Sequence, residues 1–431
     1  MSDLQDQLAG LRRKIARIDR KYADGPPAAA APTDARPARY FIEQWMTGEV
    51  IETPFGHHFE TERLYDNHRR HGSMDISSLL DLPEDLLGAL SGGEAPPSPV
   101  TRWAFLDTET TGLAGGSGTY AFLIGVGRVT AEGFRVRQFF MRDYGEEPSL
   151  LWALSEHLAN FDVLVTYNGK TYDQPLLETR YRMARARPPF ARLAHLDLLH
   201  GARRLWKLRL ESCRLVDLEN RILGVEREGD LPGEMIPYVY FEYLRTQQAW
   251  KVVPIFHHNA VDLLTTACLT GIVPFAFREP GATRFLHGAD LIGLARWFAH
   301  AGEREQAAGL MRRAIDLGLP DNLLFRTMWD MAALEKRLGR DAASLAVLTD
   351  LAAGPNPYRP QAFEALAKHY EHLECNYSLA LEMVSAARAL ADSEHLRKRE
   401  ARIRKRLVAP VKAARLPLST GGLEIPPPPD E

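Results

Sequence analysis

The chain has 431 residues, of which 45% are apolar and 25% are charged, and its formal net charge is −3. This length and apolar content are enough for more than one buried core, so we expect two folded domains with tails. A net charge so close to zero excludes a globally basic nucleic-acid binder, and three cysteines are too few for a disulfide framework. The amino terminus has no apolar signal core and no run of about eighteen apolar residues occurs, so we expect a cytoplasmic protein without a membrane segment.

Proline, glycine and alanine runs divide the chain into five parts. Residues 1–38 combine apolar residues at helical spacing with a Pro- and Ala-rich stretch, which predicts an amphipathic helix and a flexible linker. Residues 39–95 form an extension of mixed pattern, and residues 96–280 form the predicted main domain. Residues 285–405 repeat a helical pattern, and residues 406–431 are basic and then proline-rich, which predicts a disordered end.

From Trp103 onwards, strand and helix patterns alternate. Strands are predicted at 103–110, 119–129, 134–144 and 162–169, and helices at 149–161 and 175–186. Strands followed by alternating helix and strand predict an α/β domain, a mixed sheet with helices packed against it.

The stretch FLDTETTG ends an apolar strand in two carboxylates, Asp107 and Glu109. Residues two apart on a strand face the same side, so these two carboxylates are expected to lie together. Like charges held close repel unless a cation bridges them, and oxygen ligands suit Mg²⁺ or Mn²⁺. Taken alone, the stretch could equally be a strand end followed by a turn.

Two later stretches carry further acidic candidates. Asp173 in YNGKTYD follows a predicted strand and precedes a helix, so a loop can return it to the same sheet edge. Asp262 in HHNAVD lies on a predicted amphipathic helix, one turn after His258. Taken alone, YNGKTYD could be a strand that ends in a glycine turn, and HHNAVD could be a helix cap. Converging carboxylates and a histidine suit two-metal phosphoryl chemistry, in which the ions activate a water and stabilise the leaving oxygen.

The three stretches resemble the exonuclease motifs of the DEDD superfamily. Together with GGSGTYAFLIGVG and HLDLLHGARRLWKLRLESCRLVDLE, they are most similar to the bacterial YprB-like family over residues 40–275. This resemblance implies a ribonuclease H-like domain followed by tetratricopeptide-like repeats. It also implies a 3′–5′ exonuclease that uses two divalent cations. The metal ligands that it implies are Asp107, Glu109, Asp173 and Asp262.

The identity of the proton acceptor stays open between two histidines. Members of the superfamily carry a histidine five residues before the last aspartate or a tyrosine four residues before it. This chain has His257 at the first spacing and His258 at the second. One helical turn puts His258 on the face of Asp262, whereas a base held in a preceding loop could equally be His257. Two other functions remain alternatives: a binding adaptor whose nuclease domain is weak or silent, and a structure-selective endonuclease.

A basic stretch indicates DNA or RNA as the partner. Residues 180–214 hold ten Arg and Lys side chains against Asp197 and Glu211. This stretch could follow a phosphate backbone, or it could be a solvated arginine-rich helix and loop. Asp197 is interpreted as a supporting or structural carboxylate. The nucleic-acid contacts that we expect are Thr111, Gly112, Leu113, Asn168, Lys170, Arg203 and Arg204.

The pattern of residues 285–405 changes to a longer period. Similar segments begin at Leu294, Met331 and Leu366, offsets of 37 and 35 residues, which predict helix-turn-helix repeats near the tetratricopeptide length. Such repeats could bind a protein partner or act as a scaffold. The small residues expected to allow close helix packing are Ala307, Ala314, Ala343, Ala346 and Ala380. The basic run of residues 397–415 is either a nucleic-acid tether or the end of a capping helix.

Overall fold

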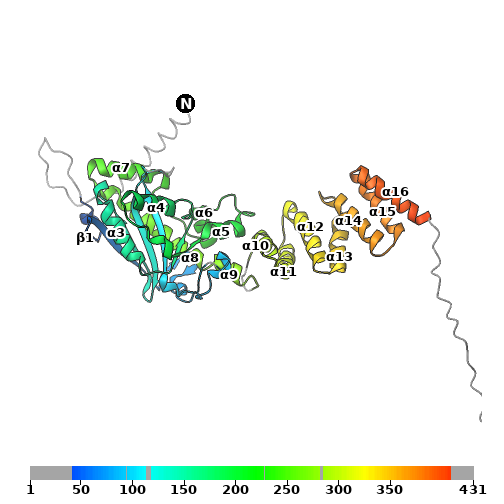
Figure 1. The fold of residues 1–431 in the computed structure, drawn as a ribbon, viewed down its shortest axis with the longest axis horizontal. Coiled ribbons are helices and arrows are strands. Elements are labelled where there is room, and N and C mark those ends of the chain that lie inside the picture. The colour runs from blue at the N-terminus through cyan, green and yellow to red at the C-terminus, as the bar shows by residue number, and fades with distance from the viewer. Residues whose placement is uncertain (1–40, 94, 113–117, 228, 282–284, 409–431) are drawn as a thin grey trace, which may run out of the picture. The chain divides into compact units, whose positions relative to one another are not determined.

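The computed structural model describes residues 41–93, 95–112, 118–227, 229–281 and 285–408 (Figure 1). The predicted helix and linker of residues 1–38, the predicted contact Leu113, and the predicted disorder after residue 408 lie outside the described residues. The chain divides into two compact units, Met1–Leu317 and Gly318–Glu431.

A seven-stranded mixed sheet forms the centre of the first unit (Figure 1). Its strands are β1 (Glu49–Thr53), β2 (Gly56–Asp66), β5 (Trp103–Thr110), β6 (Ala121–Thr130), β7 (Gly133–Phe140), β8 (Val163–Thr166) and β9 (Ala194–Asp197). They lie in the order β1-β2-β7-β6-β5-β8-β9, and a separate hairpin pairs β3 (Arg70–His71) with β4 (Met74–Asp75). β8 runs parallel to β5 and to β9, so the chain segments that leave β5 and β8 meet at one sheet edge.

The long antiparallel edge of the sheet comes from the extension whose pattern is mixed in the sequence. β2 pairs with β7 from Phe59 to Asp66. Several of its buried side chains are polar, so the sequence does not show the alternation of apolar and polar residues that is typical of a strand. His58 lies 2.8 Å from the Ser149 hydroxyl through Nδ1 and 2.9 Å from Glu60 through Nε2. Because these buried polar groups satisfy one another, they can occupy positions that otherwise need apolar residues.

Helices cover both faces of the sheet. α3 (Glu147–Leu158) packs against β1, β2 and β7, whereas α8 (Val253–Thr270) packs against β5, β6 and β7. The other α-helices described in this unit are α2 (Gly88–Ser91), α4 (Asp173–Met183), α5 (Leu198–Trp206), α6 (Leu215–Leu218), α7 (Ile236–Thr246), α9 (Val273–Arg278), α10 (Gly288–Ala301) and α11 (Arg304–Asp316). α10 packs closely on the end of α5, where a Cβ atom at Gly293 would lie 1.9 Å from the Arg204 carbonyl oxygen.

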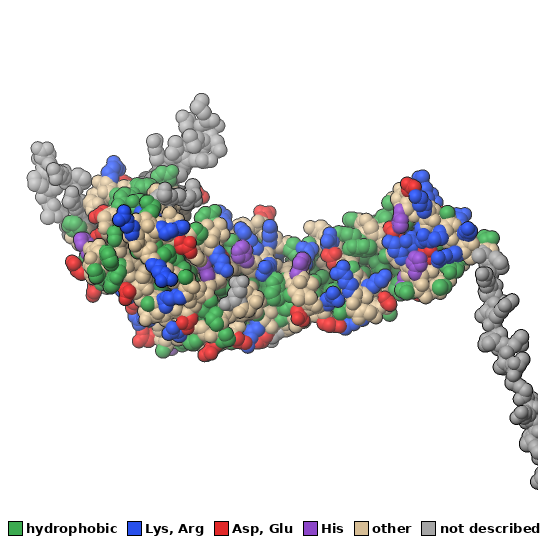
Figure 2. Space-filling model, viewed as in Figure 1, with side chains coloured by type: hydrophobic (Ala, Val, Ile, Leu, Met, Phe, Trp, Pro, Cys, Tyr) green, Lys and Arg blue, Asp and Glu red, His purple; other side chains and the backbone are tan. Residues whose placement is uncertain are grey.

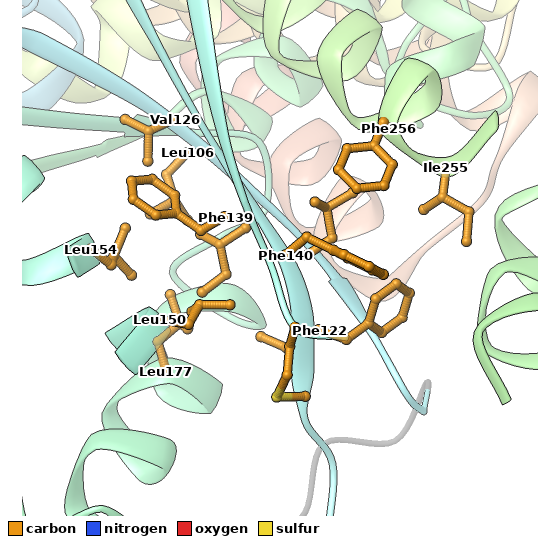
Figure 3. Close-up of a cluster of buried hydrophobic side chains, with 14 of the residues drawn as sticks. Leu106, Phe122, Val126, Phe139, Phe140, Leu150, Leu154, Leu177, Ile255 and Phe256 are labelled. Carbon is orange, nitrogen blue, oxygen red and sulfur yellow. The ribbon is translucent and has the colours of Figure 1, made fainter. Parts of the chain in front are cut away.

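Neighbouring phenylalanines on β7 anchor the two helical layers (Figure 3). Phe139 points toward Leu150 and Leu154 of α3, and Phe140 points to the opposite face, where its ring centroid lies 5.0 Å from that of Phe256 on α8. Burial of each such side chain contributes about 1.5–3 kcal/mol. The alternation of the strand thus fixes α8, the helix that carries His258 and Asp262, onto the sheet.

The segment Ala249–Arg278 contains α8 and α9 and, by length and composition alone, could cross a membrane, with a mean hydropathy of 1.7. In the structure 72% of its most apolar window is buried, and α8 packs on three strands. A central helix of a folded domain has this composition, so the segment is accounted for without a membrane.

The second unit contains only helices among its described residues. They are α12 (Asp321–Arg337), α13 (Asp341–Ala353), α14 (Arg359–His372), α15 (Tyr377–Leu390) and α16 (Glu394–Val408). Each helix packs on the next, and Ala380 is buried as expected, like Ala307 and Ala314 in the first unit. The expectation for Ala343 and Ala346 is wrong, because both side chains are exposed on α13. The tetratricopeptide assignment and a protein partner stay predictions.

Acidic side chains compensate the basic run within α16. Arg399 and Arg402 donate to Glu371 at 2.6 and 2.7 Å, and Arg404 donates to Glu400 at 2.6 Å. Figure 2 shows Lys and Arg side chains gathered over this end of the second unit. Up to residue 408, these pairs favour the capping-helix interpretation over a nucleic-acid tether.

Candidate active site

A cleft of about 510 Å³ opens where β5 and β8 end. Asp107 and Glu109 reach it from the last residues of β5, and Asp173 reaches it as the first residue of α4. The other lining residues are Thr108, Thr110, Gly112, Thr119, Tyr167, Asn168, Tyr172, Leu176, Gly233, Ile236 and Pro237. The parallel pairing of β5 with β8 therefore brings three of the four predicted ligands into one cleft.

A chain of neutral amides positions Asp107. Gln138 donates to Asn259 Oδ1 at 2.8 Å, and Asn259 donates to Asp107 Oδ2 at 2.8 Å. Gly125 lies between Gln138 and Asp107 in the strand register, and a Cβ atom there would lie 2.1 Å from Asn259 Oδ1. The glycine in LIGVG thus lets α8 approach the sheet closely enough for its asparagine to reach the carboxylate.

The other two cleft carboxylates also lack a cationic partner among the described residues. Asp173 Oδ1 accepts a hydrogen bond of 2.6 Å from the Thr108 hydroxyl, and Glu109 has no hydrogen bond or ion pair within the described ranges. Burial and the neighbouring carboxylates raise the pKa of Asp107 and of Glu109 well above their ordinary values. Burial also raises the pKa of Asp173 to about 6. Hard oxygen donors with this unmet charge fit a divalent cation such as Mg²⁺ or Mn²⁺.

The structure separates the two candidate histidines on α8. His258 lies one turn before Asp262, with its Nε2 3.6 Å from Asp262 Oδ2, whereas the side chain of His257 is exposed. His258 Nδ1 lies 2.8 Å from Asp230 Oδ2. Burial lowers the pKa of His258, but the hydrogen bond to Asp230 and the charge of Asp262 outweigh it, so the net shift is upward.

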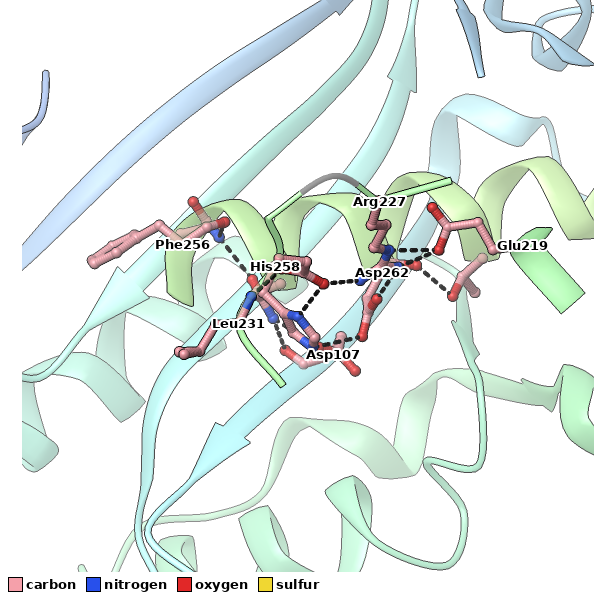
Figure 4. Close-up of polar contacts among 11 residues, drawn as sticks. Asp107, Glu219, Arg227, Leu231, Phe256, His258 and Asp262 are labelled. Carbon is pink, nitrogen blue, oxygen red and sulfur yellow. Dashed lines mark hydrogen bonds and ion pairs between the residues drawn. The ribbon is translucent and has the colours of Figure 1, made fainter. Parts of the chain in front are cut away.

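The fourth predicted ligand, Asp262, is paired with an arginine (Figure 4). Arg227 donates to Asp262 Oδ1 and also contacts Asp230 and Glu219. Among the described residues, no three His, Cys, Asp or Glu side chains are arranged to hold a metal ion. By their chemistry Asp107, Glu109 and Asp173 fit a cation, although the described structure does not gather them into such a group, whereas Asp262 is already paired with Arg227.

Sequence reasoning missed Glu219, Arg227 and Asp230. They come from the π-helical turn η6 (Glu219–Leu223) and the loop after it, whose sequence VEREGDLPG mixes both charge signs between glycines. The sequence did contain a signal for these residues: several charged residues lie in a short loop before the helix that bears Asp262.

Asp197 has a structural role at the cleft margin. Its carboxylate accepts backbone N–H groups of Asn168, Lys170 and Leu199 at 2.8, 3.1 and 3.0 Å. These bonds hold the loop after β8, in which Asn168 has a left-handed φ of 69°, and they cap the start of α5.

The predicted nucleic-acid contacts do not all reach the cleft. Gly112 and Asn168 line it, whereas the Thr111 hydroxyl already accepts the Tyr120 N–H at 2.9 Å. Lys170 lines a separate hollow beside Gln174 and His195.

Some basic residues of the stretch 180–214 are in ion pairs, and others line a hollow. Arg180 is buried against Glu147, and Arg209 is paired with Asp290 at 2.8 Å. Arg203 and Lys207, together with Arg214, line a hollow of about 580 Å³ that shares Tyr167 and Asn168 with the cleft. Arg204 is exposed on α5 outside this lining. The basic stretch is therefore not one continuous surface, because part of it lines a hollow next to the cleft and part of it is in ion pairs.

Comparison with known proteins places this arrangement in a family. A model of the RNase H superfamily matches residues 104–273, the part of the chain that includes β5, β8, α4 and α8. The uncharacterized protein YprB of Bacillus subtilis (strain 168) is 33% identical over 300 residues, which cover 69% of this chain and 71% of YprB. The chain belongs to the YprB family.

The RNase H superfamily match and the observed sheet confirm the fold predicted from the sequence. The first unit is an RNase H-like domain with a mixed sheet, and an all-helical region follows it. The family B DNA polymerase of Pyrobaculum calidifontis shows a more distant likeness, with a TM-score of 0.32 and 14% identity over 48% of this chain and 30% of the polymerase. The RNase H superfamily match indicates a nuclease fold for this YprB-family chain.

Proposed function

We propose that the chain is a metal-dependent nuclease that removes nucleotides from 3′ ends of DNA or RNA. The proposal depends on one observation: Asp107, Glu109 and Asp173 share a cleft, and the side chains that donate to Asp107 and Asp173 among the described residues are neutral. Carboxylates crowded in this way attract Mg²⁺ or Mn²⁺ strongly. The RNase H superfamily match supports the same class of reaction.

Different residues of the chain would have different roles in hydrolysis. A bound divalent cation would lower the pKa of a water molecule and stabilise the charge on the departing oxygen. Asp107, Glu109 and Asp173 would hold that cation. His258 would accept the proton of the water at Nε2, because an ionised Asp230 only accepts hydrogen bonds and so keeps the proton of the neutral ring on Nδ1.

The substrate strand has a path out of the cleft. A single strand that ends among the carboxylates would continue across Tyr167 and Asn168 into the basic hollow. Arg203 and Lys207 lie four residues apart along α5 and its C-cap and have no ion-pair partner among the described residues, so they are available to backbone phosphates. The exposed ring of Tyr172 in the cleft lining could stack on the terminal base.

The test presents 5′-labelled single-stranded and duplex DNA and RNA to the full chain with Mg²⁺ or Mn²⁺. An Asp107→Asn variant of nearly the same shape serves as the control. A ladder of shortened products that disappears in the variant is the expected result. No product from any substrate with either ion overturns the proposal, and binding without product favours the adaptor alternative.

A circular single strand separates the two nuclease modes. A circle has no ends, so an exonuclease leaves it intact while it shortens the linear strand of the same sequence. Cutting of the circle at a rate similar to that of the linear strand would assign an endonuclease instead.

A further inference from the structure

Arg227 occupies the centre of the acidic side of the site (Figure 4). Its Nε donates to Glu219 at 2.7 Å, its Nη1 to Asp230 at 3.1 Å and its Nη2 to Asp262. The three carboxylates come from η6, the following loop and α8. The side chain of Arg227 is only 10% exposed, so these contacts are largely removed from water.

Arg227 pairs with one oxygen of the predicted fourth metal ligand, and a histidine ring faces the other oxygen. Asp262 Oδ1 accepts from Arg227, and Asp262 Oδ2 faces His258 Nε2 at 3.6 Å. The guanidinium is planar and permanently charged, so one such group can satisfy several carboxylates at once. Asp262 also does not line the cleft that holds Asp107, Glu109 and Asp173.

The positive charge in the described site is therefore placed unevenly. The Asn259 amide and the Thr108 hydroxyl, both neutral, are the donors to Asp107 and Asp173. Asp262, in contrast, has a buried guanidinium and an imidazole against it. Asp107, Glu109 and Asp173 have no direct ion pair among the described residues, whereas Asp262 already has one.

We propose that Arg227 takes the place of the second divalent cation, so that the site binds one ion, held by Asp107, Glu109 and Asp173. This inference depends on the proposed nuclease function and defines its metal requirement. Arg227 acts as a positioning residue: it fixes Asp262 directly and His258 through Asp230. A guanidinium stays charged at any working pH, so this half of the site needs no metal to be complete.

Counting bound Mn²⁺ on the full chain tests the inference without any nuclease readout. Equilibrium dialysis or calorimetry should find about one Mn²⁺ ion per wild-type chain, with or without a phosphorothioate oligonucleotide that resists cleavage. Arg227→Gln should create a second Mn²⁺ site, because Asp262 then lacks its cation, whereas Arg227→Lys should not. About two ions on the wild-type chain, or an unchanged count in Arg227→Gln, would overturn the inference.

A second comparison stays informative if Arg227→Gln fails to fold. Asp262→Asn keeps the arginine and should leave the Mn²⁺ dissociation constant within about threefold of the wild-type value, whereas Asp107→Asn should weaken it about 100-fold. Loss of the ion in Asp262→Asn as severe as in Asp107→Asn would show that Asp262 is a ligand and that the inference is wrong.

The failure of the inference can be told apart from the failure of the proposed function. Two bound ions together with product ladders would refute only the role of Arg227. Absence of both Mn²⁺ binding and product would refute the nuclease itself.

Discussion

The candidate active site has two groups of three carboxylates, one side lining the cleft and the other beside it, and their charges are balanced differently. The carboxylates of the first side are Asp107, Glu109 and Asp173, and those of the second side are Glu219, Asp230 and Asp262. Neutral donors contact the first set, and Arg227 contacts all three members of the second. The fold thus compensates one group of acids with an internal ion pair and gives the other group only neutral donors, and crowded carboxylates without a cation destabilise the folded protein.

The largest effect is expected on the side without a cation. Asp107→Asn should lower nuclease activity by about 1,000-fold or more, because a cation ligand is lost. The same change should raise the free energy of unfolding in EDTA by about 1 kcal/mol, because it removes charge repulsion. Product ladders and urea unfolding measure the two effects.

The matched control for that change is Asp316→Asn, which alters an exposed aspartate at the end of α11. It should change neither the nuclease activity nor the free energy of unfolding in EDTA. If Asp107→Asn destabilised the metal-free chain as strongly as a core mutation, the carboxylate would be structural and the comparison between the two sides would fail.

Among the carboxylates that Arg227 contacts, Asp230 is expected to matter for the rate. Asp230→Ala should reduce kcat about 10–100-fold with little change in KM, because His258 loses the carboxylate that orients its ring. Asp230→Glu should recover part of the rate. Steady-state kinetics on a labelled single strand provide the measurement. A change confined to KM would instead place Asp230 in substrate binding.

Reversing charges in the basic hollow should have an intermediate effect, on the affinity for single-stranded nucleic acid. Arg203→Glu combined with Lys207→Glu should weaken single-strand binding about tenfold and reduce the salt dependence of binding by about one to two phosphate contacts. Fluorescence anisotropy in the Asp107→Asn background measures binding without cleavage. Arg185→Glu combined with Arg187→Glu reverses the same charge at exposed positions outside the hollow and should have little effect. Equal losses in both double variants would contradict the proposed path.

The smallest effect is a pH dependence of the metal-free fold. The pKa of Asp173 is about 6 in the folded chain against an ordinary value of 3.8, so the folded state binds more protons in this window. Stability in EDTA should therefore fall as pH rises from about 4 to about 6, by at most about 1.4 kcal/mol per pH unit from this group. Urea unfolding of wild type and Asp173→Asn across that range should show the slope only in the wild type. The same slope in both chains would assign it to other groups.

The sequence predicted the central strands well, because apolar runs bounded by glycine define them. The predicted strand 103–110 coincides with β5, and the predicted strand 162–169 contains β8. β1 and β2 were missed, since buried polar residues such as His58 and Glu60 hide the strand alternation. The partner of a buried polar group is a distant residue, here Ser149, which no local pattern reveals.

The acidic candidates followed from local rules, but their partners did not. Strand periodicity placed Asp107 beside Glu109, and helical periodicity placed His258 beside Asp262. The pairing of Asp262 with Arg227 joins positions 35 residues apart through a loop of mixed charge, and its geometry has no periodic signature.

The sequence by itself determined the α/β domain with a mixed sheet, the helical region after it and the set of acidic candidates, because apolar periodicity and short motifs act over a few residues; the resemblance of those motifs to a known family added the RNase H-like fold. Only the tertiary structure decided which histidine lies beside Asp262, which basic residues remain outside ion pairs, and where Arg227 lies. Those outcomes depend on how strands and helices distant in sequence pack together. Long-range packing determines the distance between two charges, and that distance determines which charges are compensated inside the protein and which are left for an ion.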